Sequence, residues 1–264
     1  MKKYGIPYAN APWGPWSGCT PVSEGCRNCY AKRIIEGRFK RDFSIVTRAS
    51  DATFFAPLHR KQPTRYFVCP GGDFFHPAAD RWWRVDALRV IQKTPRHTYI
   101  IVTKRPERII EQLYDVGDLY NLGLNFLPNV WFLVSVEDQE TADLRIPQLL
   151  KLREHPSGGW PVLGVSHEPA ISPVAFQYHR GWLNPNSETD LIINKTPQLD
   201  WIVMGGESGS NARPMHPNWV RCVRNTCIVA GVPFWFKQWG PRGKGNLIDG
   251  EKWEQLPEGR TFDQ

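Results

Sequence analysis

Six short apolar runs recur along the chain, and their spacing of about thirty to forty residues is that of repeated strand–helix units. Each run is rich in β-branched and aromatic residues and is nearly continuous rather than alternating, as expected for strands buried on both faces. The runs lie at residues 65–69, 98–102, 130–134, 162–165, 201–204 and 234–236. This repeat predicts a fold built around a parallel sheet.

The stretches between these runs carry helical patterns, at residues 79–93, 105–114, 137–152 and 218–230. Pro217 suits a helix start, and Gly231 followed by Pro233 is typical of a helix end. Right-handed strand–helix–strand units form either an open doubly wound sheet or a full or partial barrel. Because no glycine-rich dinucleotide fingerprint is present, we favour an α/β barrel formed by residues 1–264 as one domain. The Pro-, Asn- and Ser-rich stretch at about 180–198 is predicted to be an insertion loop.

Polar and charged residues follow every predicted strand. They are Asp73, Lys104, Arg105, Ser135, Glu137, Ser166, Glu168, Glu207 and Lys237, and Gly206 lies next to Glu207. In barrels and open α/β sheets alike, ligands bind at the carboxyl ends of the strands. We therefore expect these residues to surround one site, although some of them could instead form salt bridges between loops.

The excess of positive charge is local. The chain has 33 Lys and Arg against 26 Asp and Glu, a formal charge of +7, and residues 27–65 alone hold ten basic and three acidic residues. Such a stretch can attract phosphate, and nucleic acid is the usual large polyanion. The alternative is a solvated helix face followed by a loop. No run of eighteen apolar residues predicts a membrane span, and the N-terminus lacks the pattern of a secretory signal, so we expect a reducing cytoplasmic location.

Three closely spaced cysteines form the sharpest local motif. Cys19, Cys26 and Cys29 are separated by six and two residues. Thiolates grouped in this way in a cytosolic chain indicate a metal or cluster site. A 4Fe-4S cluster held by three cysteines leaves one iron open for another ligand, whereas structural zinc needs four protein ligands. A zinc knuckle that braces the N-terminal loop is therefore the alternative.

A fourth ligand could come from elsewhere in the chain. Cys69, at the end of a predicted strand, or a distant histidine remains possible. Cys222 and Cys227 are five residues apart in a predicted helix, so they lie on different faces.

The cysteines belong to a longer pattern, W-x-P-x-x-G-C-x-x-x-S-x-G-C-x-N-C-Y-A, that runs from Trp13 to Ala31. This pattern resembles the three-cysteine-motif proteins common in bacteriophages and some bacteria, a family placed with or near the radical S-adenosylmethionine (SAM) enzymes. The resemblance continues through most of the chain, at Asp73–His76, Thr103–Arg108, Leu127–Trp131, Val134–Gln139, Glu168–Pro169, Trp201–Pro217 and Pro233–Gly240. It implies a partial (β/α)6 TIM-like barrel of the radical SAM type, with its cluster loop at residues 13–30.

The resemblance also implies a chemistry. Cys19, Cys26 and Cys29 would bind a 4Fe-4S cluster whose open iron chelates SAM, and reductive cleavage would give a 5′-deoxyadenosyl radical. The residues implied for SAM binding are Tyr30, Gly71, Gly72, Asp73, Ser135, Ser166 and Gly206. Those implied for catalysis or substrate contact are Lys104, Glu137, Glu168, Glu207 and Lys237. An electron donor such as flavodoxin or ferredoxin is expected as a partner.

The substrate is expected to be a nucleotide or nucleic acid, for instance hypermodified thymidine in phage DNA, in the host cytoplasm if a phage encodes the chain. Whether the enzyme acts as an isomerase, a lyase or a transferase stays open. A non-catalytic nucleic-acid-binding protein with zinc or a cluster is the main alternative. A metal-independent nucleotide hydrolase would leave the three cysteines unexplained.

Overall fold

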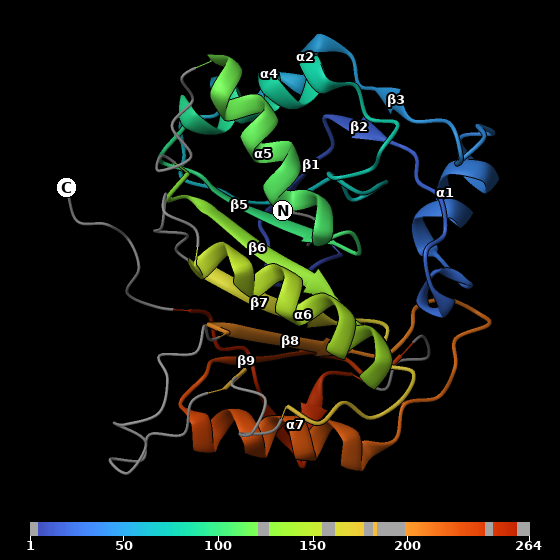
Figure 1. The fold of residues 1–264 in the computed structure, drawn as a ribbon. Helices are drawn as coiled ribbons and strands as arrows, with labels where there is room; N and C mark the ends of the chain where they lie inside the picture. The colour runs from blue at the N-terminus through green and yellow to red at the C-terminus, as the bar shows by residue number, and fades with distance from the viewer. Residues whose placement is uncertain are drawn as a thin grey trace.

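A computed structural model describes residues 5–120, 127–154, 162–176, 182–183, 199–240 and 245–257. Its centre is a seven-stranded sheet in which neighbouring strands are parallel throughout (Figure 1). In spatial order the strands are β1 (Ala11–Trp13), β4 (Arg65–Val68), β5 (Thr98–Thr103), β6 (Val130–Ser135), β7 (Val162–His167), β8 (Trp201–Gly205) and β9 (Phe234–Gln238). Spatial order follows chain order, so each connection moves in the same direction along the sheet.

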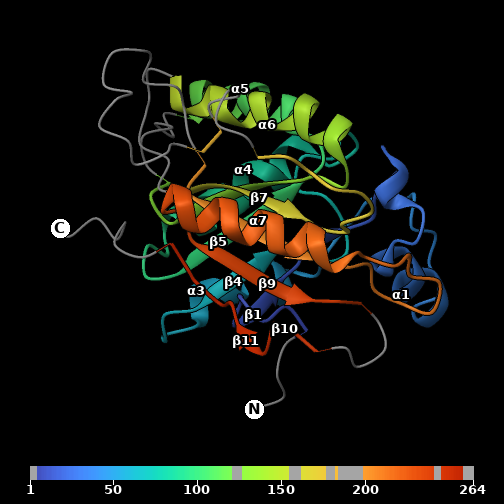
Figure 2. The same ribbon diagram turned by 90° about the horizontal axis from the view of Figure 1, so that it is seen from below.

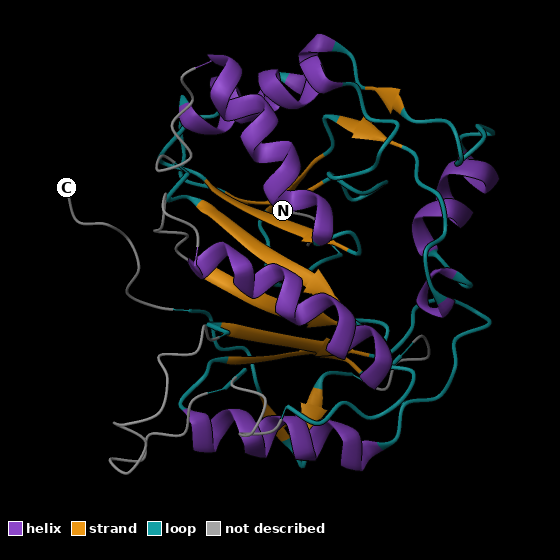
Figure 3. Ribbon diagram, in the orientation of Figure 1, coloured by secondary structure: helices purple, strands orange, loops and turns teal. Residues whose placement is uncertain are grey.

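This strand order produces the predicted partial barrel. A sheet wound in one direction places its helices on one face and curls around the other, as in a TIM-type barrel. The strands β1 and β9 form the two opposite edges of the sheet, which leaves the barrel open. Figures 2 and 3 show the long helices against the outer face. These helices are α4 (Arg81–Gln92), α5 (Glu107–Tyr120), α6 (Gln139–Glu154) and α7 (Pro217–Ala230).

Local sequence explains where these helices begin and end. The Asp80 carboxylate accepts a hydrogen bond from the backbone N–H of Trp82 at 2.7 Å and so caps α4. Asp138 does the same for α6, where the N–H of Thr141 donates at 2.8 Å. Gly231 ends α7 in a left-handed conformation with φ 65°, which confirms the predicted helix end.

The six predicted strands and four predicted helices are all present, with ends shifted by a few residues. The edge strand β1 was not predicted, because its three residues include Pro12 and no β-branched residue. The predicted insertion loop at 180–198 lies outside the described residues, apart from residues 182–183. The remaining elements are η1 (Glu24–Cys26), α1 (Tyr30–Arg38), β2 (Trp16–Ser17), β3 (Thr47–Arg48), α2 (Asp51–Phe54), α3 (Ala56–His59), β10 (Leu247–Ile248) and β11 (Glu251–Lys252).

Both faces of the sheet are apolar. The larger core lies between the sheet and the helices, and a second cluster fills the concave face. Tyr8, Trp201 and Trp235 belong to this second cluster, with Tyr8 packing edge-on against both tryptophans. Side chains therefore fill the concave face, and the carboxyl ends of the strands form the edge of the sheet toward which β6 points in Figure 1, on the side of α1. None of the described helices combines the length and apolar character that a bilayer crossing requires.

Candidate functional site

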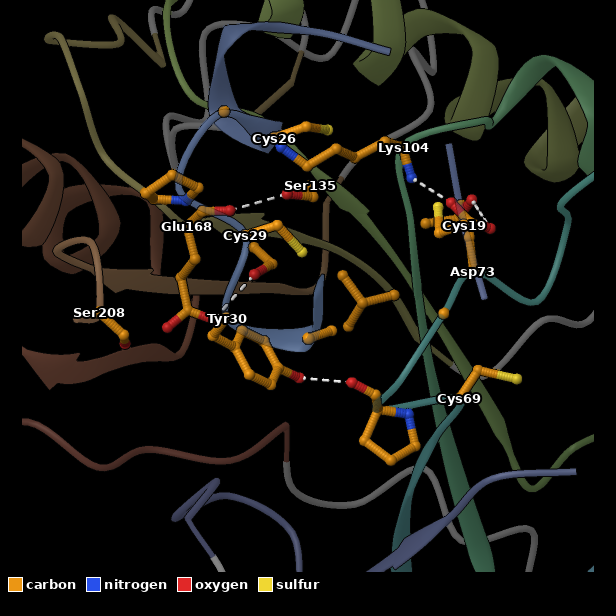
Figure 4. A pocket seen from close by; sticks show the side chains of 18 of the residues that line it. Cys19, Cys26, Cys29, Tyr30, Cys69, Asp73, Lys104, Ser135, Glu168 and Ser208 are labelled. Atoms are coloured by element: carbon orange, nitrogen blue, oxygen red, sulfur yellow. Dashed lines mark hydrogen bonds between the residues drawn. The ribbon is translucent and has the colours of Figure 1, made fainter. Parts of the chain in front are cut away.

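The carboxyl ends of the strands and the cysteine loop enclose a cavity of about 210 Å³ (Figure 4). The residues expected at this edge from the sequence come together here. Those that line the cavity are Cys19, Cys26, Cys29, Tyr30, Gly72, Asp73, Lys104, Arg105, Ser135, Ser166, Glu168, Gly206, Glu207 and Lys237. Two expected residues, Gly71 and Glu137, are not among the lining residues.

A close backbone contact fixes the start of the cysteine loop. The N–H of Gly18 donates to the carbonyl of Gly71 at 2.9 Å, and that of Cys19 donates to the carbonyl of Phe43 at 2.8 Å. Gly18 has φ 110°, and a side chain there would collide with the backbone of Ile45. Glycine is therefore required directly before Cys19.

Buried ion pairs hold the Cys19 end of the loop. The Arg105 guanidinium lies 3.1 Å from Asp73, donates to the Cys19 sulfur at 3.5 Å and donates to the carbonyl of Thr20 at 2.9 Å. Asp73 also accepts from the hydroxyl of Thr103 at 2.8 Å. Arg105 and Asp73 are only 5% and 7% exposed. Both carboxylate oxygens of Asp73 thus have protein donors.

Glu137 supports the middle of the loop from below. It is fully buried, pairs with Arg145 at 2.8 Å and Lys104 at 3.1 Å, and accepts from the N–H of Gly25 at 3.3 Å. A side chain at Gly25 would meet both Lys104 and Glu137 and would have to displace this ion pair, which favours glycine directly before Cys26. Burial alone would raise the pKa of Glu137, but the charges of Lys104 and Arg145 outweigh it and lower the pKa.

A third network reaches the Cys26–Cys29 end from the opposite side of the barrel. Glu207 is 4% exposed, and Arg213 binds it with a 2.6 Å contact from Nη2 and a 3.0 Å contact from Nε. The amide of Asn28 donates to the same carboxylate at 2.9 Å. Arg213 also pairs with Glu24 at 2.9 Å. Burial would raise the pKa of Glu207, but the hydrogen bonds from Arg213 and Asn28 lower it.

The remaining polar group lies on the cavity floor. Glu168 pairs with Lys237 at 3.0 Å, and its other oxygen accepts from Ser166 at 3.0 Å and from the Tyr8 hydroxyl at 3.3 Å. The Ser135 hydroxyl donates to the Glu168 carbonyl at 2.8 Å, as Figure 4 shows. Glu168 and Lys237 are 14% and 17% exposed, so both stay accessible from the cavity.

All three motif cysteines carry free, partly exposed thiols. Burial raises the pKa of the Cys19 thiol to about 11, and the Asp73 charge adds to this effect while Arg105 opposes it. Cys69, a possible fourth ligand, is buried, and burial raises its pKa well above the usual value. Within the described ranges, no three side chains of His, Cys, Asp and Glu lie close enough to hold a single metal ion. A closed four-ligand zinc site is therefore not formed by these described side chains.

Exposed apolar and basic side chains surround the outer side of the cysteine loop. Large apolar residues that are more than a third exposed here are Val22, Tyr30, Ile34, Phe39 and Ile45. Lys32, Arg33, Arg38, Lys40 and Arg41 are exposed among them. The opposite face of α1 packs inward, where Ala31 and Ile35 contact Cys19 and Cys29. This surface, residues 22–45, therefore adjoins the cysteines directly.

Three site residues were not identified as such from the sequence. Tyr8 precedes the first strand, Asn28 separates two cysteines, and Arg213 lies in the loop before α7. Their contacts join distant segments, 189 residues apart for Arg213 with Glu24 and 179 for Asn28 with Glu207, so no local pattern indicates them. Asn28 and Arg213 lie within the motif segments 13–31 and 201–217, whereas Tyr8 lies outside them.

Comparisons with known proteins place these observations in context. Two solved structures of spore photoproduct lyase, one a mutant with bound AdoMet and dinucleoside spore photoproduct and one complexed with dinucleoside spore photoproduct, are similar at 12% and 13% identity. Their TM-scores are 0.47 and 0.48, over 85% of this chain and 62% of those chains. None of the curated proteins matches. A family model covers residues 3–264, and the chain belongs to that family, described as "protein of unknown function (DUF5131)".

Proposed function

We propose that this chain is a radical SAM enzyme that holds a 4Fe-4S cluster on Cys19, Cys26 and Cys29. The single observation that carries the proposal is that these thiols and the polar ends of six strands line one cavity. A catalytic cofactor site needs both parts, ligands for the metal and an adjoining pocket for a reactant.

The three cysteines lie on one loop beside the cavity, which suits a 4Fe-4S cluster whose fourth iron stays open for another ligand. In a 4Fe-4S cluster each cysteine binds a different iron, so the sulfurs are farther apart than around zinc. When bound with SAM, such a cluster supplies an electron for cleavage of a carbon–sulfur bond, which yields a carbon radical.

The chain's own residues then bind and orient SAM. Lys237 and Glu168 offer one positive and one negative group at the cavity floor, suited to the carboxylate and amino groups of an amino acid. The ring of Tyr30 lines the wall, and its hydroxyl donates to the Pro70 carbonyl at 2.8 Å. Asp73 differs from its expected role, because its oxygens already accept from protein donors. We assign it to positioning the Cys19 end of the loop.

The substrate we favour is a nucleotide unit of a nucleic acid. The basic residues of the 22–45 surface would attract phosphate next to the cavity, and exposed Phe39 and Tyr30 could stack on bases. Modified thymidine in phage DNA is a specific candidate, with flavodoxin or ferredoxin as the electron donor.

Anaerobic reconstitution with iron and sulfide tests the proposal. The protein should become brown, bind about four irons per chain as one cluster requires, and release 5′-deoxyadenosine when reduced in the presence of SAM. Cys19→Ala, Cys26→Ala and Cys29→Ala should each abolish the product. Cys222→Ala is the matched control, since Cys222 is exposed on α7 and should leave iron content and product unchanged.

Two outcomes would contradict the proposal. A colourless protein with one zinc per chain would favour the non-catalytic nucleic-acid-binding alternative. A fully loaded cluster that yields no 5′-deoxyadenosine with SAM would exclude the radical mechanism while leaving a cluster protein.

A further inference from the structure

The loop that follows β8, residues 207–213, contacts the cysteine loop and α1 at three separate points. Arg213 reaches Glu24, Asn28 reaches back to Glu207, and the Arg33 guanidinium packs on Gly209 so closely that a side chain at Gly209 would collide with it. The contacts at residues 24 and 28 flank Cys26 and lie next to Cys29.

From these contacts we infer that Glu207 and Arg213 form a latch that positions Cys26 and Cys29 at the cavity, and that Glu207 is a positioning residue rather than a catalytic one. This inference rests on the proposed function in one respect, the identity of the group that the cysteines bind. The latch itself is a property of the chain without any bound group.

The hydrogen-bonding capacity of Glu207 supports this role. Its Oε2 accepts from the Asn28 amide at 2.9 Å and from the Arg213 N–H and Nε at 2.9 and 3.0 Å, and its Oε1 accepts from Arg213 Nη2 at 2.6 Å. A 4%-exposed carboxylate with this many donors has little capacity left to bind a reactant. Its bonds instead connect the end of β8 to the cysteine loop.

Arg213 supplies the geometry that the latch needs. One edge of its guanidinium binds Glu207, while Nη1 and Nη2 reach the side chain and the carbonyl of Glu24 at 2.9 and 3.2 Å. A planar fork with five donors can join two partners at once, whereas a lysine ammonium binds as a point charge. Lysine at this position should therefore keep the charge but loosen the loop.

Cys19 provides a contrast within the same loop. Arg105 and Asp73 hold it, and neither contacts the 207–213 loop in any hydrogen bond or ion pair described here. Loss of the latch should therefore free Cys26 and Cys29 and leave Cys19 in place.

Alkylation of the metal-free protein tests the latch. Peptide mapping would give the rate at which iodoacetamide modifies each cysteine, with exposed Cys222 as the internal standard. In Arg213→Met and Glu207→Gln, Cys26 and Cys29 should react about tenfold faster than in the wild type, since loss of charged hydrogen bonds favours local opening. In Arg213→Lys the alkylation rates of Cys26 and Cys29 should fall between those of the wild type and Arg213→Met. In every variant the rate at Cys19 should change less than about twofold. Arg89→Met, which removes an exposed pair on α4, is the control and should change no rate.

Unchanged rates at Cys26 and Cys29 in both variants would overturn the latch. Equal acceleration at all three cysteines, together with a fall in unfolding stability, would also overturn it, because that is general loosening. If a variant fails to fold, Glu24→Gln weakens the side-chain contact of Arg213 with residue 24 while leaving Glu207 intact, and it should still accelerate Cys26 more than Cys19.

A second readout uses reconstituted protein, where Arg213→Met should lose iron to a chelator faster than the wild type and Arg213→Lys should partly rescue retention. Because alkylation needs neither iron nor SAM, a missing cluster would refute the proposed function without affecting the latch.

Discussion

The two ends of the cysteine loop are anchored in different ways. At the Cys19 end, Arg105 and Asp73 form a pair that is nearly inaccessible to solvent. At the Cys26–Cys29 end, Glu207 is buried, but its partner Arg213 is 25% exposed and Glu24 is 54% exposed. Loss of one partner from a buried ion pair strongly destabilises the folded protein, whereas exposed ion pairs contribute little to its stability. The Cys19 end is thus anchored in the folded core, whereas the contacts at the Cys26–Cys29 end hold only the loop itself.

The largest effect is expected at the buried end. Asp73→Asn should lower the free energy of unfolding by about 3 kcal/mol, because Arg105 would be left buried without its counter-charge. Urea denaturation of the metal-free protein measures this. Asp86→Asn is the matched control, since Asp86 pairs with Arg89 on the exposed face of α4 and should cost less than about 0.5 kcal/mol. Similar values for both variants would remove the distinction between the two ends.

A smaller effect that depends on pH is expected at Glu137, below the middle of the loop. Glu137→Gln should lower the free energy of unfolding by about 2 kcal/mol at pH 7, where the carboxylate accepts charged hydrogen bonds from Arg145 and Lys104. The folded-state pKa is lowered from the ordinary value of 4.5, so this stability is complete above 4.5 and is lost as the pH falls through the lower folded-state pKa.

Urea unfolding of the wild type and Glu137→Gln at pH 7, 5, 4 and 3 measures this dependence. The difference between the two proteins should stay constant from pH 7 to 5 and shrink at lower pH. A difference that does not change down to pH 3 would mean that the pairs with Lys104 and Arg145 are not its source.

The exposed end of the loop should show a still smaller cost. Glu24→Gln should lower the free energy of unfolding by less than about 1 kcal/mol, because Glu24 is more than half exposed and its pair with Arg213 is screened by solvent. The same urea titration compares it with Asp73→Asn. A cost as large as that of Asp73→Asn would show that the latch is part of the global core.

The sequence predicts the sheet and its functional edge because both depend on local patterns. A continuous apolar run followed by polar residues marks a strand and its carboxyl end, and the strand order then brings those ends together. Which polar residues face the cavity and which hold the loops could not be predicted. Glu137 and Glu168 both follow a strand, but Glu137 meets Arg145 from α6 and becomes buried, whereas Glu168 meets Lys237 and stays accessible. Only the fold decides between these two environments.

The last and smallest effect on stability concerns the surface outside the loop. Substitution of Glu for Arg38, Lys40 and Arg41 together should change the free energy of unfolding by less than about 0.5 kcal/mol, since all three are exposed.

If this surface receives a nucleic acid, the same triple variant should bind a single-stranded oligonucleotide at least about tenfold more weakly. The slope of log affinity against log salt should fall by about three, one for each lost phosphate contact. Fluorescence anisotropy at several salt concentrations measures both quantities. Reversing Arg89 and Lys151, exposed residues on the helices of the outer face, is the control and should leave the slope unchanged. Equal binding by the triple variant and the wild type would assign the positive charge of residues 22–45 to a role other than nucleic-acid binding.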